Sequence, residues 1–150
     1  MNKVSFHSAD IPFYYKEKKK LKQWIINCFT NEGKQLDTIT YVFCSDDYLL
    51  NINKQFLQHD YYTDIITFDL SNTSKNSIEA EVYISVDRVR DNAQKLNAPY
   101  LEELRRVIIH GALHLCGYKD KTKQDQKQMR AKEAEKLSTY NLYCSTCNLG

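Results

Sequence analysis

The chain of 150 residues is poor in glycine and proline, nearly balanced in charge, and without long apolar runs. Its four glycines and two prolines exclude collagen-like and low-complexity chains, which are rich in these residues. The net charge of +2 indicates no partner selected by charge alone, and the pI of about 8.2 is below the value of about 9 that marks strongly basic nucleic-acid binders. Apolar runs such as 107–109 fall far short of the ~18 residues of a membrane span. We therefore expect one domain over residues 1–150 and no membrane partner.

The cysteines number five, an odd set, and the N-terminal stretch lacks an apolar signal segment. Cys28, Cys44 and Cys116 lie within apolar segments, where a cysteine is usually a small core residue. Cys144 and Cys147 form a CxxC pair, but without a second pair or a strand–helix context a metal or redox role is disfavoured. We expect reduced thiols and a cytoplasmic protein.

Apolar periodicity predicts strands and helices that alternate along the chain. The predicted strands cover 4–7, 38–44, 64–70 and 79–85. The predicted helices cover 16–31, 47–57, 87–96, 101–116 and 122–139, with Ser45 or Asp46 and then Asp87 as N-terminal caps. The lysine-rich start of the first helix is interpreted as a solvated face, with RNA contact as the alternative. We expect an α+β fold in which helices cover one mixed sheet of about four strands, followed by a loose tail from residue 141 onward.

Two histidines lie four residues apart in the stretch RRVIIHGALHLCGYKDK at 105–121. Apolar residues surround this predicted helix on most sides, so we expect a central buried helix with His110 and His114 inside the protein. Residues four apart share a helix face, and one divalent ion would satisfy both imidazoles. Gly117 permits a turn that brings Asp120 to the same ion. Two imidazoles and a carboxylate leave a fourth position for water, as in catalytic zinc sites. The alternative is that both histidines are core residues and that Asp120 caps the last helix.

The stretch HGALHLCGYKD resembles the signature of the YbeY family of single-strand-specific metallo-endoribonucleases, whose usual form is HGxLHLxGYDH. Leu50 and Asn51 resemble the family's LN motif, the stretch YTDIITFD at 62–69 resembles its TDVLSFP strand, and 81–85 takes the place of its GDIxIS strand. The resemblance implies zinc-dependent hydrolysis of single-stranded RNA, in 16S rRNA 3′-end maturation and ribosome quality control. The implied partners are single-stranded rRNA and the small ribosomal subunit.

Two positions depart from the family pattern. The third histidine of the signature falls on Asp120, an acceptable zinc ligand whose negative charge favours a less acidic bound water and a greater tolerance of Mn²⁺. The arginine that the family commonly carries after LN falls on Gln55, so Lys54 is the nearest substitute cation for the phosphate. The alternative for Lys54 is a solvated helix side chain.

The predicted site therefore combines metal ligands with cations and one aromatic ring. The predicted metal ligands, which are also catalytic residues, are His110, His114 and Asp120, and Lys54 is a further catalytic candidate. The predicted substrate-binding residues are Lys54, Arg105, Arg106, Tyr118 and Lys119. Tyr118, like Tyr61 and Tyr62, is a candidate for base stacking, with ordinary packing as the favoured alternative.

Two other functions are open from the sequence alone. Zinc peptidases carry HExxH, with the glutamate as general base, and Gly111 occupies that place here. A non-catalytic ribosome-binding factor with a structural metal would need a fourth protein ligand. His59 and Cys116 are the candidates, although Cys116 falls on the wrong helix face and His59 is expected in a loop.

Overall fold

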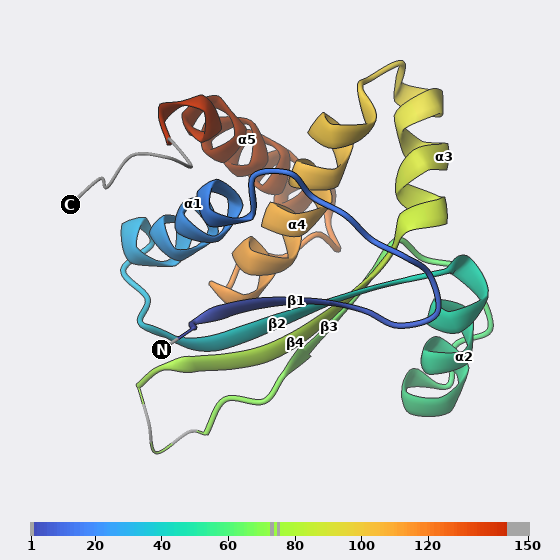
Figure 1. Ribbon diagram of the computed structural model, residues 1–150. Helices are drawn as coiled ribbons and strands as arrows, with labels where there is room; N and C mark the ends of the chain where they lie inside the picture. Colours follow the sequence, from blue (N-terminus) through green and yellow to red (C-terminus); the bar gives the residue numbers. More distant parts are fainter. Residues whose placement is uncertain (1, 73, 75, 144–150) are drawn as a thin grey trace.

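A computed structural model of the chain describes residues 2–72, 74 and 76–143 (Figure 1). Its four strands form one sheet in the order β1-β2-β4-β3. The strands are β1 (Val4–Ser8), β2 (Leu36–Cys44), β3 (Ile65–Asp69) and β4 (Ile78–Ser85). The pairs β1–β2 and β2–β4 are parallel, whereas β3 runs antiparallel to β4. The expected mixed sheet of four strands is therefore confirmed.

The described residues also form five α-helices. They are α1 (Lys18–Asn31), α2 (Asp46–Leu57), α3 (Val86–Leu96), α4 (Tyr100–Leu115) and α5 (Lys123–Thr139), and a short 3₁₀ helix, η1 (Tyr140–Leu142), follows. None of these helices is long and apolar enough to cross a bilayer. In Figure 1, α4 lies over one face of the sheet with α1, α5 and α3 around it, and α2 lies at one end.

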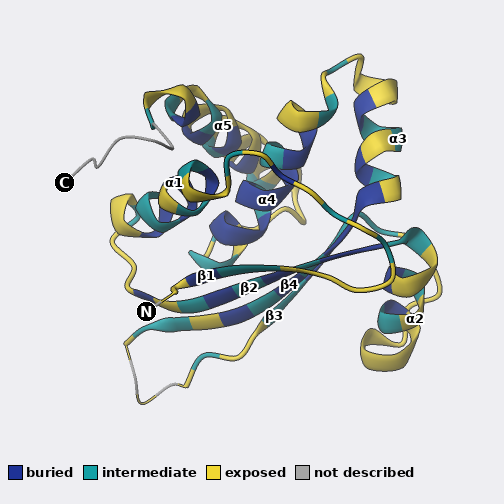
Figure 2. Ribbon diagram, in the orientation of Figure 1, coloured by how far each residue is buried: buried dark blue, intermediate teal, exposed yellow. Residues whose placement is uncertain are grey.

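Helix α4 is the central buried helix. Its buried apolar residues are Leu104, Val107, Ile108, Ile109, Ala112 and Leu113. Figure 2 shows the middle of α4 as buried, while α1 and α5 expose their outer faces. Gly111 allows α4 to approach the sheet closely, because a Cβ atom there would lie 2.9 Å from Cδ1 of Ile65 and 3.4 Å from Cγ1 of Val82. The expected burial of this helix is confirmed, and its C-terminal turn reaches the edge strand β3.

The cap expected for α3 is wrong. The helix begins at Val86, and the hydroxyl of Ser85 accepts a hydrogen bond from the backbone N–H of Arg88. Asp87 instead accepts a 2.9 Å hydrogen bond from the backbone N–H of Asp46, at the start of α2. The Asp87 carboxylate can reach the start of α2 because α2 and α3 begin side by side at the same end of the sheet. No local sequence pattern shows this arrangement.

The C-terminal chain is packed through Tyr143. The ring of Tyr140 meets Trp24 edge-on at 5.1 Å, and its hydroxyl lies 2.7 Å from that of Tyr15. The hydroxyl of Tyr143 accepts a 2.7 Å hydrogen bond from Nδ2 of Asn27. Within the expected tail, Tyr143 thus contacts α1, while Tyr140 just before the tail contacts α1 and the segment that precedes it. The CxxC pair, Cys144 and Cys147, lies outside the described residues.

Candidate functional site

A cavity of about 310 Å³ opens between the end of α4, the edge strand β3 and the segment 58–64 that joins α2 to β3. His110, His114 and Asp120 line one side of it. The other side includes Leu57, His59, Tyr61 and Asp64. The three residues predicted to bind a metal thus lie around one depression, because α4 ends at this edge of the sheet and the chain turns back at Gly117, whose φ is +107°.

The two imidazoles lie on the same face of α4. Their ring centroids are 6.3 Å apart and their planes differ by only 8°. Nε2 of His110 lies 3.4 Å from Oδ2 of Asp120. A helical spacing of four and a short return loop are sufficient to bring these groups together.

His114 is exposed and His110 is half-buried. The expectation that both rings lie inside the protein is therefore wrong for His114. Ala112 and Leu113 in the same turn are fully buried and fill the side that faces the core. His114 is left at the mouth of the cavity, where solvent and a ligand can reach it.

Both histidines are held through Nδ1. Nδ1 of His110 lies 2.7 Å from Oε2 of Glu133 on α5, and Nδ1 of His114 lies 2.9 Å from the carbonyl oxygen of Tyr118. A carbonyl only accepts, so Nδ1 of His114 donates the hydrogen, and in a neutral imidazole Nε2 then carries the lone pair. A carboxylate or carbonyl on the outer nitrogen is the usual support of a metal-binding imidazole.

Glu133 is a residue of the candidate site that the sequence analysis missed. Its side chain is 3% exposed, and Oε1 also lies 3.2 Å from Nη1 of Arg106. Burial raises the pKa of the Glu133 carboxyl, but the hydrogen bond from His110 and the charge of Arg106 outweigh it and hold the pKa below its usual value. Conversely, burial lowers the pKa of His110, while Glu133 and Asp120 raise it above its usual value overall.

The position of Glu133 in the last helix carried a signal. Met129 and Leu137 are the apolar contacts of that helix, and Glu133 falls midway between them at steps of four. A carboxylate on the core-facing stripe of a helix needs a buried partner. The pattern indicates a buried acid, although it does not identify the partner.

Asp64 is a further carboxyl group in the cavity wall. Its Oδ2 accepts a 3.2 Å hydrogen bond from Nδ2 of Asn92. Burial raises the pKa of Asp64, and this effect exceeds the opposing charges of Arg106 and His110. Asp64 is thus a cavity carboxyl that protonates more readily than an ordinary aspartate.

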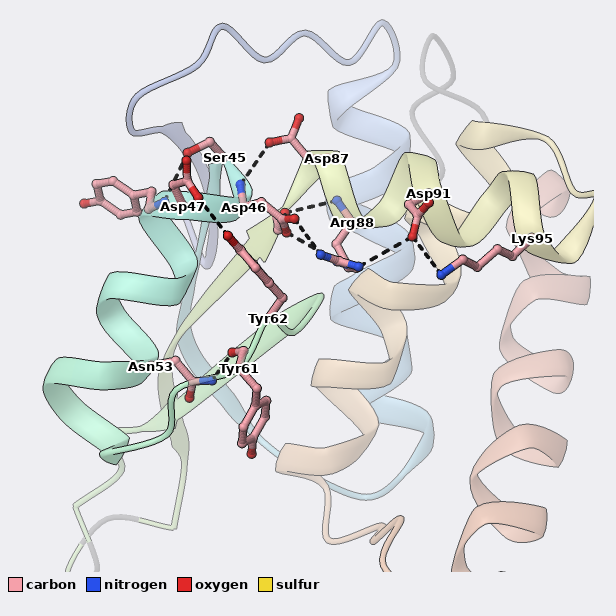
Figure 3. Close-up of polar contacts among 12 residues, drawn as sticks. Ser45, Asp46, Asp47, Asn53, Tyr61, Tyr62, Asp87, Arg88, Asp91 and Lys95 are labelled. Atoms are coloured by element: carbon pink, nitrogen blue, oxygen red, sulfur yellow. Dashed lines mark hydrogen bonds and ion pairs between the residues drawn. The ribbon is translucent and has the colours of Figure 1, made fainter.

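Asn53 holds the far wall of the cavity in place. It is buried in α2, and Nδ2 donates a 2.8 Å hydrogen bond to the carbonyl of Tyr61, as Figure 3 shows. The backbone carbonyl of Asn53 accepts a 3.1 Å hydrogen bond from the backbone N–H of His59. Asn51, the residue matched to the LN motif, is exposed. The hydroxyl of Tyr62 adds a 3.2 Å hydrogen bond to Asp47 (Figure 3), so α2 fixes this segment at two points.

Three of the four basic residues predicted to bind substrate already have partners. Nζ of Lys54 lies 3.4 Å from Oδ1 of Asp60, and Lys54 does not line the cavity. Nη1 of Arg105 donates to the hydroxyl of Tyr15 at 3.1 Å. Arg106 contacts Glu103 through Nε at 2.8 Å and Nη2 at 2.5 Å. The geometry therefore does not bring Lys54 or Arg105 to the cavity, and it holds Arg106 in a buried charge network.

Tyr118 and Lys119 lie on the return loop. The hydroxyl of Tyr118 donates to Oε1 of Glu32 at 2.6 Å, so its half-buried ring is anchored to the end of α1. The carbonyl of the same residue holds His114. Lys119 is exposed beside Asp120, and it does not line this cavity.

The residues that the alternative functions need are also placed. Gly111 stands where a peptidase motif has its glutamate, and a Cβ atom there would lie 2.9 Å from Cδ1 of Ile65, so a larger side chain would require Ile65 to shift. Cys116 does not line the cavity, and burial raises the pKa of its thiol to about 11. His59 does line it, with its ring stacked on Tyr61 at 5.1 Å and Nδ1 3.0 Å from the tyrosine hydroxyl.

The donor chemistry around the cavity suits a divalent metal, because two imidazole nitrogens and a carboxylate oxygen face a common space. Within residues 2–72, 74 and 76–143, no three His, Cys, Asp or Glu side chains are grouped closely enough to hold an ion as they stand. His114 and Asp120 are exposed, so both have room to turn.

Comparison with known proteins agrees with the resemblance found in the motifs. A family described as "Endoribonuclease YbeY" matches residues 3–141. A relative of that name from Cytophaga hutchinsonii is 45% identical over 135 residues, which cover 90% of this chain and 94% of the relative. Another from Flavobacterium psychrophilum is 45% identical over 139 residues, or 93% and 97% of the two chains.

A solved structure shares the fold as well. The solution structure of TM1509 from Thermotoga maritima matches with a TM-score of 0.61 and 26% sequence identity. The match covers 91% of this chain and 88% of that one.

Proposed function

Because the chain belongs to the YbeY family of endoribonucleases, we propose that it hydrolyses single-stranded RNA with a zinc ion held by His110, His114 and Asp120. One observation carries the proposal: each imidazole is supported at Nδ1, and both rings lie with the Asp120 carboxylate at one cavity. Two supported imidazoles and a carboxylate form a three-ligand set that leaves room for substrate.

A bound Zn²⁺, or Mn²⁺ in its place, would polarise a phosphoryl oxygen and supply a nucleophile at neutral pH. The chain's own residues would bind this ion and orient the side chains that hold it. Glu133 keeps Nδ1 of His110 occupied, and the Tyr118 carbonyl does the same for His114. His110 and His114 are both held at Nδ1, so we expect them to stay in place while the exposed Asp120 turns.

The proposed biological substrate is the 3′ end of 16S rRNA on the small ribosomal subunit, with a role in ribosome quality control in the cytoplasm. The resemblance of the motifs to the family supports this substrate. The open mouth of the cavity is consistent with it, because the exposed His114 is within reach of a flexible strand.

The test compares three substrates on one metal-depleted preparation to which Zn²⁺ or Mn²⁺ is returned. Single-stranded RNA, duplex RNA and casein are offered to the native protein, to His114→Ala and to His7→Ala. His7 is an exposed histidine on β1, away from the cavity, and serves as the matched control. We expect cleavage of single-stranded RNA only, restored by the metal, lost in His114→Ala and kept in His7→Ala.

The alternatives predict other results. Cleavage of casein would identify a peptidase, and unfolding on metal removal without any cleavage would identify a structural metal. RNA cleavage that persists in His114→Ala would contradict the proposed ligand set. The end groups of the RNA products distinguish attack by water from attack by the 2′-hydroxyl.

A further inference from the structure

A second depression of about 310 Å³ lies on the α5 side of the predicted metal ligands. His110 and Asp120 line both this depression and the cavity described above. The two hollows therefore meet at these side chains. A nucleic-acid strand bound over His110 and Asp120 would therefore lie next to the segment 58–64 on one side and α5 on the other.

The cavity on the first side offers no cation for RNA. Neither lysine nor arginine is among the described residues that line it. In the second depression, Arg106 faces the carboxylates of Glu103 and Glu133 at 2.5 and 3.2 Å. Its charge is therefore neutralised within the protein.

Arg130 differs from Arg106 although both line the second depression. It is exposed on α5, and within the described part of the chain its guanidinium takes part in no ion pair or hydrogen bond. Its acidic neighbour one turn along is Glu133, which points inward to His110 and Arg106. An unpaired guanidinium next to the metal ligands is thus a consequence of the buried network.

We propose that Arg130 binds the RNA phosphate next to the scissile phosphodiester, on the α5 side of the ligands. A guanidinium matches a phosphate with two parallel hydrogen bonds, and an exposed arginine loses little hydration when it forms them. Arg130 would then do what the sequence analysis assigned to Lys54. This inference rests on the proposed function, since it takes single-stranded RNA as the ligand.

The test uses Arg130→Gln, with Lys127→Gln as its matched control. Lys127 is an exposed cation on the same helix that lines neither depression. The probe is a fluorescein-labelled, 2′-O-methylated single-stranded RNA, titrated by anisotropy against metal-depleted protein at several salt concentrations. For Arg130→Gln we expect Kd to rise about fivefold, the upper range of one exposed ion pair. The slope of log K against log salt should fall in magnitude by about 0.7, the loss of one single-strand phosphate contact.

Two variants separate charge from geometry. Arg130→Lys should restore the salt slope but only part of the affinity, because lysine keeps the charge and lacks the planar fork. Lys127→Gln should leave both quantities close to native. Equal effects of Arg130→Gln and Lys127→Gln would mean that only the general charge of α5 matters, and this result would overturn the proposal.

An assay of RNA cleavage by the metal-loaded native protein distinguishes failure of this inference from failure of the proposed function. If the native protein cleaves RNA and Arg130→Gln changes neither KM nor the salt slope, the phosphate contact is wrong and the nuclease stands. If Arg130→Gln weakens binding as expected but no metal supports cleavage, the contact stands and the nuclease is wrong. Failure of the native protein to bind the probe would overturn the contact directly.

Discussion

Replacement of Glu133 by glutamine tests how the buried network supports the predicted metal ligands. The Glu133 carboxylate is 3% exposed and contacts His110 at 2.7 Å and Arg106 at 3.2 Å. Glutamine has nearly the same shape, but it removes the negative charge. Its amide NH₂ would also face either His110 or Arg106, both of which donate hydrogen bonds to Glu133. Because Arg106 keeps Glu103 as a counter-charge, the loss of unfolding free energy should lie below the ~3–5 kcal/mol of a fully broken buried pair. We expect about 2 kcal/mol of unfolding free energy.

The same change should weaken metal binding. Loss of an outer partner of a metal-binding histidine typically costs about 10- to 100-fold in metal affinity, and His110 is the ligand that Glu133 holds. Urea unfolding of the metal-free protein measures the first effect, and zinc competition with a chromophoric chelator measures the second. Glu135→Gln is the control, since Glu135 is an exposed carboxylate on the same helix.

The two measurements separate a structural role from a positioning role. A fall in stability with zinc affinity unchanged would show that Glu133 only packs α5 against α4. In that case Nδ1 support at His110 would have no bearing on the metal, and the reasoning from the hydrogen-bond pattern would be refuted.

Three further predictions concern other residues. Hydrogen bonds from Lys136 and Tyr118 outweigh burial and hold the pKa of Glu32 at about 2 instead of 4.5; Glu32→Gln should therefore cost about 1–2 kcal/mol of unfolding free energy at neutral pH. The difference in unfolding free energy between the native protein and Glu32→Gln, measured by urea unfolding, should shrink as the pH falls from about 4.5 toward 2. A carboxyl group whose pKa is lowered by folding stabilises the folded state while it is ionised, and that contribution is lost as it becomes protonated. A difference that does not change with pH would contradict this prediction. Asp120→His removes a negative ligand, so the acidic limb of the pH–activity profile should move to lower pH, and an unchanged limb would count against Asp120 as a ligand. Lys54→Gln should change kcat by less than about twofold and stability by less than about 0.5 kcal/mol, as for an exposed ion pair; a large loss of kcat would return Lys54 to the site.

Local sequence patterns predicted most of what positions the site. The step of four between His110 and His114 fixes a common helix face, because the period of an α-helix is set by its backbone. Gly117 ends that helix with a positive φ, as expected. Asp120 then returns to Nε2 of His110.

Contacts between segments that are distant in the sequence could not be predicted from local patterns. Asp87 was expected to cap α3, yet it binds the start of α2, 41 residues away. Asn53, which holds the cavity wall, is one of several polar residues in an amphipathic helix, and only its burial distinguishes it from the exposed Asn51. Which side chain a helix buries depends on the surface against which it packs.

The sequence by itself determined the succession of strands and helices along the chain and the central apolar helix. It also determined that His110, His114 and Asp120 lie together at the end of that helix and in the loop beyond it. These follow from backbone periodicity and from short loops, which act over a few residues. Only the tertiary structure decided that Glu133 and the Tyr118 carbonyl hold the imidazoles and that His114 is exposed. It also decided that Arg106 is neutralised, while Arg130 has no ion-pair partner among the described residues. Those outcomes depend on how α5 packs against α4, and a packing angle is set by the whole core rather than by any segment of it.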